Sequence, residues 1–163
     1  MKDHNPVSEN CWKEWISKKA VANAGVVLFN MQQQALLMRR IYSDDWTIPS
    51  GAINSDETPE KAAKRELLEE TNINISNYST SYFEQVYIAT FLGKRDIKGL
   101  ERTDITITYW AYLPYFEIKA KVDEAEVAQA VWILKNEMKD FSMHPETNKQ
   151  LRAAFDRMQL KIP

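Results

Sequence analysis

The stretch from Gly51 to Ile73, GAINSDETPEKAAKRELLEETNI, constrains the fold of this chain more than any other segment. Within it, Thr58 can cap a helix, Pro59 suits the first helical position, and good helix formers run from Glu60 to Thr71. The residues just before it, Trp46 to Gly51, predict a short strand that ends in a turn. The sequence therefore predicts a strand, a turn and a helix that follow one another closely.

The predicted helix carries a cluster of carboxylates. Glu66 is three residues from Glu69 and four from Glu70, so the three side chains should lie on one side of the helix. Arg65 is four residues before Glu69 and can pair with it, and we expect it to neutralise only one of the three. Glu57 lies just before the helix, close enough to join the same site. A cluster with this much negative charge indicates a bound cation.

The chemistry of these side chains restricts the identity of that cation. Carboxylate oxygens are hard ligands that suit Mg²⁺ or Mn²⁺, whereas zinc prefers His and Cys, which the stretch lacks. A glutamate-rich helix face is in general only a solvated surface. Here the turn, Glu57 and the Arg-Glu step coincide with the glutamate cluster at fixed spacing. The segment therefore predicts a divalent-metal site, for which phosphate chemistry is the expected purpose.

Hydrophobic patterning outside this segment predicts further strands and one further helix. The strands are expected at residues 20–29, 35–40, 81–92, 105–113 and 128–134. Residues 93–104, GKRDIKGLERTD, should connect two of them as a hairpin loop. A C-terminal helix should begin at Pro145, with an apolar face formed by Leu151, Ala154, Phe155 and Met158. Strands and few helices in mixed order predict an α/β fold with a mixed sheet.

Length, charge and cysteine content limit the kinds of protein that this chain can be. The chain has 163 residues, enough for one domain with a hydrophobic core, and its net charge of −2 gives no general attraction to nucleic acid or anionic membranes. The single Cys11 excludes an internal disulfide framework and suits a reducing compartment. The start of the chain lacks a signal-peptide core, and no apolar run approaches transmembrane length. We therefore expect a cytoplasmic protein.

The Gly51–Ile73 stretch resembles the Nudix box, Gly-x5-Glu-x7-Arg-Glu-U-x-Glu-Glu-x-Gly-U, in which U is a bulky aliphatic residue. The matching positions are Gly51, Glu57, Arg65, Glu66, Leu67, Glu69, Glu70 and Ile73. Asn72 stands where the family has glycine, and it should tolerate the left-handed conformation expected at the helix end. Ser50 and Asn54 replace a common glycine and a common carboxylate near the turn, outside the defined positions.

The resemblance implies a fold, a domain organisation and an activity. The fold would be the Nudix α-β-α sandwich with a mixed β-sheet, covering roughly residues 20–155. Residues 1–163 would form a single Nudix hydrolase domain, with an N-terminal extension at 1–19 and the core and C-terminal helix at 20–163. The activity would be Mg²⁺-dependent hydrolysis of a pyrophosphate bond in a nucleoside diphosphate linked to another moiety, with Mn²⁺ as the alternative ion.

The resemblance also implies roles for individual residues. The implied metal ligands are Glu66, Glu69, Glu70, Glu57 and the backbone carbonyl of Gly51. The implied catalytic residues are Glu66, Glu69 and Arg65, of which Arg65 would orient a carboxylate. The general base stays open between Glu66, Glu101 and Glu126.

Residues outside the box are candidates for holding the substrate. Arg39 and Arg40 end a predicted strand near the box turn, where an arginine can clamp a phosphate. Any of four aromatic residues could stack on a base, although aromatic residues in strands usually belong to the core: Tyr42, Trp46, Tyr87 and Trp110.

The sequence leaves the substrate open among nucleotide sugars or ADP-ribose, dinucleoside polyphosphates, (d)NTPs and capped RNA ends. The expected partner is a small-molecule nucleotide, without membrane and without nucleic acid other than a capped RNA end. The oligomeric state stays open, with a homodimer as one alternative. A Nudix-fold module that senses a nucleotide without cleaving it is the second hypothesis, which the retained box carboxylates disfavour. A purely structural domain would leave those carboxylates unexplained.

Overall fold

The computed structural model of the protein describes residues 21–80, 82–95 and 101–163, with the backbone alone described at 91–95 and 101–103. The predicted N-terminal extension at 1–19 and the side chain of Glu101 therefore lie outside the described part. Within the described residues, no helix combines the length and apolar character that crossing a membrane requires.

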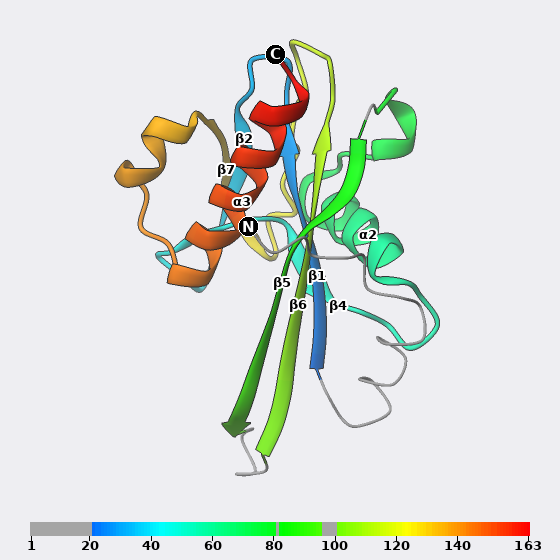
Figure 1. The fold of residues 1–163 in the computed structure, drawn as a ribbon, viewed down its shortest axis with the longest axis vertical. Coiled ribbons are helices and arrows are strands. Elements are labelled where there is room, and N and C mark those ends of the chain that lie inside the picture. Colours follow the sequence, from blue (N-terminus) through cyan, green and yellow to red (C-terminus); the bar gives the residue numbers. More distant parts are fainter. Residues whose placement is uncertain (1–20, 81, 96–100) are drawn as a thin grey trace.

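The described strands and helices follow one another in mixed order along the chain (Figure 1). In chain order they are β1 (Val21–Phe29), β2 (Ala35–Arg40), β3 (Trp46–Thr47), β4 (Ser50–Ala52), α2 (Pro59–Thr71), the 3-10 helix η1 (Ile75–Asn77), β5 (Tyr82–Arg95), β6 (Glu101–Tyr112), β7 (Val127–Ile133), the 3-10 helix η2 (Lys135–Asp140) and α3 (Pro145–Lys161).

The described strands form one mixed sheet. Its order is β3-β2-β1-β6-β5, with β4 paired to β1 and β7 paired to β2. β1 and β6 run parallel, and the other pairings are antiparallel. The predicted mixed sheet is thereby confirmed.

Helices α2 and α3 cover opposite faces of this sheet. Consecutive residues of a strand point to opposite faces, and Leu28 and Phe29 are consecutive in β1. Leu28 packs in a buried cluster with Leu67 of α2, whereas Phe29 packs in a different cluster with Phe155 of α3. The molecule is therefore a three-layer α-β-α sandwich, as the resemblance implied.

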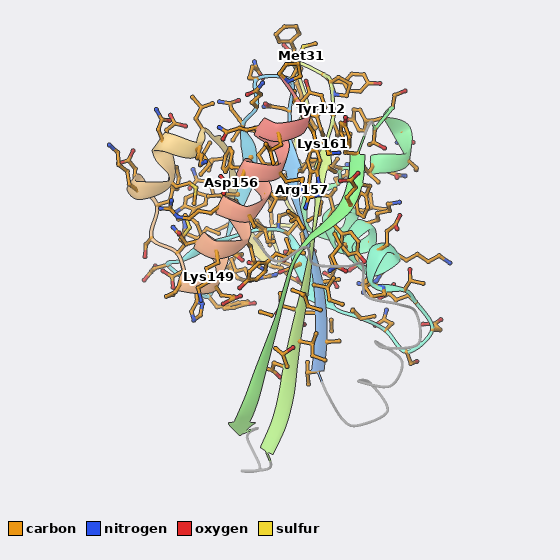
Figure 2. The ribbon with its side chains drawn as sticks, in the orientation of Figure 1. Met31, Tyr112, Lys149, Asp156, Arg157 and Lys161 are labelled. Atoms are coloured by element: carbon orange, nitrogen blue, oxygen red, sulfur yellow. The ribbon has the colours of Figure 1, made fainter. Side chains whose placement is uncertain are left out.

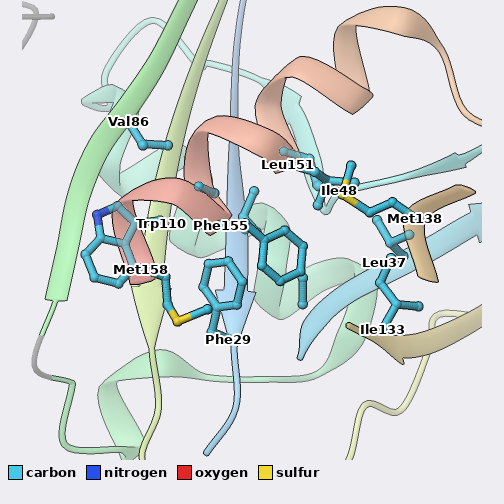
Figure 3. Packing of buried hydrophobic residues seen from close by; sticks show 13 residues of the cluster. Phe29, Leu37, Ile48, Val86, Trp110, Ile133, Met138, Leu151, Phe155 and Met158 are labelled. Carbon is cyan, nitrogen blue, oxygen red and sulfur yellow. The ribbon is translucent and has the colours of Figure 1, made fainter. Parts of the chain in front are cut away.

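The core on the α3 side combines aliphatic and methionine side chains with aromatic rings (Figure 3). The ring of Phe29 lies 5.0 Å from that of Phe155 and 6.4 Å from that of Trp110, both edge to face. The four residues predicted to form the apolar face of α3 are all buried. The opposite side of α3 carries exposed charged side chains, among them Lys149 and Asp156 (Figure 2).

Two predicted strand boundaries are wrong. The strand expected over Trp46 to Gly51 is two short strands, β3 and β4, interrupted at Ile48 and Pro49, where proline lacks an amide hydrogen for ladder pairing. The loop expected at 93–104 is mostly strand, since β5 continues to Arg95 and β6 begins at Glu101.

Cross-strand pairing explains this longer hairpin. The register pairs position 94 with 102 and position 95 with 101, so partner strands override the weak local preference of glycine and charged residues. The hairpin extends beyond both helices in Figure 1.

Candidate active site

Both ends of α2 are capped by the residues that the sequence indicated. Oγ1 of Thr58 accepts a hydrogen bond from the backbone N–H of Lys61 at 3.2 Å. Asn72 adopts the left-handed conformation, with φ of 58°, and donates its backbone N–H to the carbonyl of Leu68 at 2.9 Å. Asn72 therefore makes the turn for which the Nudix box uses glycine, and the carboxylates of α2 sit on a fixed helix.

Arg65 is the centre of the carboxylate cluster. Its Nε lies 3.0 Å from Oε2 of Glu57, and its Nη1 lies 2.7 Å from Oε1 of Glu66 and 3.0 Å from Oε2 of Glu69. Its Nη2 also donates to the carbonyl of Ala52 at 2.8 Å. The prediction that Arg65 pairs with only one of the three helix carboxylates is wrong, because the guanidinium presents five donors and contacts both Glu66 and Glu69.

These contacts shift proton affinities in opposite directions. The hydrogen bonds from Arg65 hold the pKa of the Glu57 carboxyl below its usual value, against a smaller opposing effect of burial. The pKa of Arg65 is raised, chiefly by its hydrogen bond to Glu57. Both groups therefore stay charged at neutral pH, and the cluster is held as an ionic network.

Glu70 occupies a separate and more buried position. Its side chain is 2% exposed, and its Oε2 lies 3.0 Å from Nη1 of Arg40 in β2. Its Oε1 accepts the backbone N–H of Ser50 at 3.1 Å, and Nη2 of Arg40 donates to the carbonyl of Ser50 at 2.8 Å. Burial raises the pKa of Glu70 to about 7, and the charge of Arg40 limits the rise. Glu70 is thus fixed between α2, β2 and β4.

Gly51 allows β4 to approach the helix closely. A Cβ atom at this position would lie 2.2 Å from the carboxylate carbon of Glu66. Atoms that are not bonded to each other do not approach so closely, so only glycine fits here with Glu66 in place. The glycine that opens the box and the glutamate in its middle are therefore in direct contact.

The donor set suits a hard divalent cation. Glu57, Glu66, Glu69 and Glu70 offer carboxylate oxygens, which Mg²⁺ prefers, and Gly51 lets the carboxylate of Glu66 lie directly against β4. Within the described residues, no three acidic, histidine or cysteine side chains are positioned together to hold an ion. Arg65 and Arg40 instead pair with these carboxylates.

The predicted substrate residues lie near one another but differ in their contacts. Arg40 reaches the box through Glu70 and Ser50. The guanidinium of Arg39 lies 6.0 Å from the ring centre of Trp46. Trp46 also packs against Phe141, whose ring centre lies 5.2 Å from that of Trp46 and whose plane is perpendicular to it. The structure thus brings Arg40 to the box, while Trp46 already has partners for its ring.

A cavity beside Arg40 contains residues that sequence reasoning missed as a group. Its volume is about 280 Å³, and Tyr42, Asp45, His144 and Thr147 help to line it. One wall is the loop between β2 and β3, and the other is the start of α3. About a hundred positions separate the two walls in the chain, so no local spacing could have revealed the cavity.

The three candidate general bases lie in different parts of the molecule. Glu66 lies within the carboxylate cluster. Glu126 has an exposed side chain, and its backbone carbonyl accepts the N–H of Ile41 at 3.0 Å, next to Arg40. The side chain of Glu101 lies outside the described part.

The fold and the site together define a class of protein. A family model described as the NUDIX domain matches residues 19–155, which is most of the chain. The chain therefore belongs to the NUDIX family.

Curated relatives match over shorter stretches. An RNA pyrophosphohydrolase of Pseudomonas putida (strain F1) is 51% identical over 51 residues, which is 31% of this chain and 32% of that protein. An RNA pyrophosphohydrolase of Actinobacillus succinogenes is 36% identical over 73 residues, or 45% of this chain and 37% of that protein. The chain thus spans about a third of the length of the curated relatives that it matches.

Solved structures share the fold. The NUDIX domain of Shewanella oneidensis NrtR, complexed with ADP ribose, superimposes with a TM-score of 0.67 and 22% identity over 93% of this chain and 99% of that chain. A binary complex of a C. elegans Ap4A hydrolase gives a TM-score of 0.66 and 21% identity over 88% of this chain and 100% of that chain. At this identity the likeness shows the fold.

Proposed function

We propose that the chain hydrolyses a pyrophosphate bond in a nucleoside diphosphate linked to another moiety, with Mg²⁺ or Mn²⁺ as its ion. The observation that carries the proposal is the clustering of the box carboxylates around two arginines, where α2 meets β2 and β4. The proposed ligands are Glu66, Glu69, Glu70, Glu57 and the carbonyl of Gly51.

Each side chain has a role that follows from its contacts. Glu70 is held by Arg40 and by the amide of Ser50, so it would present a fixed carboxylate. Glu69 is the most exposed of the three helix carboxylates, at 56%, and is therefore the freest to leave Arg65. When bound, the ion would neutralise phosphate oxygens and lower the pKa of attacking water. Arg65 would keep the remaining carboxylates oriented.

Proton transfer and phosphate binding complete the proposal. Glu66 lies against Gly51 within the cluster and is our first candidate for accepting the proton of water, with Glu126 and Glu101 as alternatives. Arg40, partly exposed and adjacent to the box, could bind a phosphate oxygen. Arg39 could add charge from the neighbouring position.

The substrate class is drawn from the relatives as a hypothesis. The curated relatives act on RNA, as their names state, and the structural neighbours include proteins associated with ADP ribose and Ap4A. A test panel should therefore contain RNA with a 5′ triphosphate or cap, ADP-ribose, nucleotide sugars, dinucleoside polyphosphates and (d)NTPs.

The test is to incubate the protein with this panel and Mg²⁺, with and without EDTA, and to identify the products. We expect Mg²⁺-dependent cleavage of at least one compound between two phosphorus atoms. Binding of a nucleotide without turnover of any compound at high protein concentration would instead support the sensor hypothesis. The bound ADP ribose of the NrtR NUDIX domain makes that hypothesis worth testing.

A further inference from the structure

We propose that Asp123, in the connection between β6 and β7, is a positioning residue for the proposed ion site, because the turn that it forms sets the place of Glu70 relative to Arg40. The inference rests on the proposed function, since Glu70 is one of the proposed ligands of the ion. It gives a role to a segment that neither the box nor the candidate substrate residues include.

One end of this turn is bonded to the C-terminal end of α2. The backbone N–H of Asp123 donates to the carbonyl of Glu70 at 3.1 Å, and that of Lys121 donates to the carbonyl of Thr71 at 2.8 Å. The last four carbonyls of a helix have no partner within the helix, so the connection supplies the donors that these two carbonyls need. Glu70, whose side chain is a proposed ligand, is thus bonded to Asp123 through its own backbone.

The other end of the turn is bonded to the end of β2. The backbone N–H of Ile41, directly after Arg40, donates to the carbonyl of Glu126 at 3.0 Å. The pairing of β2 with β7 also shifts register between Arg39 and Arg40, and an irregularity of this kind re-aims side chains. Both members of the 3.0 Å ion pair between Arg40 and Glu70 are therefore held by the same short segment.

Asp123 fixes the shape of this segment. Its carbonyl accepts the backbone N–H groups of Glu126 and Val127 at 3.0 Å and 2.8 Å, and its Oδ1 accepts the N–H of Ala125 at 3.0 Å. Asp and Asn side chains favour turns by accepting such a bond from the residue two positions on. The contact with α2 and the contact with β2 are only three positions apart in the chain, so this one turn determines how the ends of α2 and β2 lie relative to each other.

The carboxylate of Glu70 depends on that relative position. Its side chain is 2% exposed and is held by Arg40 and by the backbone N–H of Ser50, so water cannot replace a partner that moves away. Removing a group that orients a metal ligand from outside the coordination shell lowers metal affinity or activity about 10- to 100-fold. Asp123 acts through the backbone, one step further from the ion, so we expect an effect at the lower end of this range.

The experiment measures the affinity of the protein for Mn²⁺ alone by isothermal titration calorimetry, together with kcat on whichever compound the panel identifies. Asp123→Ala removes the acceptor for the N–H of Ala125, and it should weaken Mn²⁺ binding about tenfold and lower kcat by a similar factor. Asp123→Asn keeps a side-chain carbonyl oxygen and should match the unaltered protein. Asp123→Ser, whose hydroxyl supports such turns more weakly, should lie between these two variants.

The matched control is Glu124→Ala, which removes an exposed carboxylate from the same turn and should change neither value. Circular dichroism without metal shows whether each variant is folded, and if Asp123→Ala is unfolded, the comparison of Asp123→Ser with Asp123→Asn decides.

Three results would overturn the inference. One is a Mn²⁺ affinity that is the same in the unaltered protein, Asp123→Ala and Asp123→Ser. Another is a loss in Asp123→Asn as large as that in Asp123→Ala, because the charge of Asp123 would then matter rather than the turn. The third is an unaltered protein that binds no Mn²⁺. The Mn²⁺ series can be read even if no compound is cleaved, and the panel can be positive while the series shows no effect, so failure of this inference is distinguishable from failure of the proposed function.

Discussion

Removing Arg65 should destabilise the protein more than removing an ordinary surface charge. The guanidinium contacts Glu57, Glu66 and Glu69 and the carbonyl of Ala52. Glu57 and Glu66 are only 13% and 14% exposed. In Arg65→Ala these two carboxylates would face each other with little solvent and no cation.

The expected loss of stability in Arg65→Ala lies between two limits. Exposed ion pairs contribute about 0–1 kcal/mol, whereas breaking a buried pair costs about 3–5 kcal/mol. Arg65 is 26% exposed, so we expect Arg65→Ala to lower the free energy of unfolding by about 2–3 kcal/mol. Arg65→Lys keeps the charge but loses the forked geometry, and should cost about half as much.

The assay is urea unfolding followed by far-UV circular dichroism, in metal-free buffer at pH 7. The control is Lys135→Ala, which breaks an exposed 2.7 Å ion pair with Asp156 and should cost less than about 1 kcal/mol. A loss for Arg65→Ala no larger than that of the control would refute the account of Arg65 as the centre of the cluster.

The effect of Arg65→Ala should also depend on pH. The pKa of Glu57 in the folded protein lies below its ordinary value of 4.5. Glu57 therefore contributes stability above pH 4.5 that is lost as the pH falls through the lowered pKa. Arg65 causes this lowering of the Glu57 pKa. The difference in free energy of unfolding between the unaltered protein and Arg65→Ala should therefore shrink as the pH falls from 7 to 3.

Three further substitutions test other parts of the structure. Gly51→Ala should lower kcat about 10²-fold, because the added Cβ displaces the carboxylate of Glu66; an unchanged kcat would contradict that contact. Asn72→Ala should lower the free energy of unfolding by about 1 kcal/mol and Asn72→Gly should not, since the position is left-handed; urea titration distinguishes them. Phe155→Ala should cost about 3–5 kcal/mol by opening a cavity beside Phe29, and a loss below 1 kcal/mol in the same assay would argue against the packing in Figure 3.

Sequence reasoning predicted the parts of the fold that depend on local signals. The cap at Thr58, the proline after it and the left-handed Asn72 all act within one or two helical turns, so spacing alone defined α2. Short apolar runs likewise located β1 and β2, and the alternation of Thr and Ile located part of β6. The extension of the β5–β6 hairpin was missed, because pairing between distant residues stabilises it against its local composition.

The candidate site was predicted in its residues but not in its arrangement. Helical spacing suggested the pair of Arg65 and Glu69, but the approach of Glu57 to the same guanidinium depends on the path of the preceding loop. The burial of Glu70 depends on β2, which brings Arg40 to it from thirty residues away. The cavity at Tyr42 depends on contacts between the β2–β3 loop and the segment before α3 that no spacing encodes.

The central claim, that the box carboxylates support hydrolysis, is tested most directly by the rate of Glu69→Gln on whichever compound the panel identifies. We predict that kcat at saturating Mg²⁺ falls at least about 10²-fold, as when a charge that stabilises the transition state is removed. Glu60→Gln changes an exposed glutamate of the same helix and should leave kcat unaltered. Full activity in both Glu69→Gln and Glu70→Gln would contradict the assignment of these carboxylates to the active site.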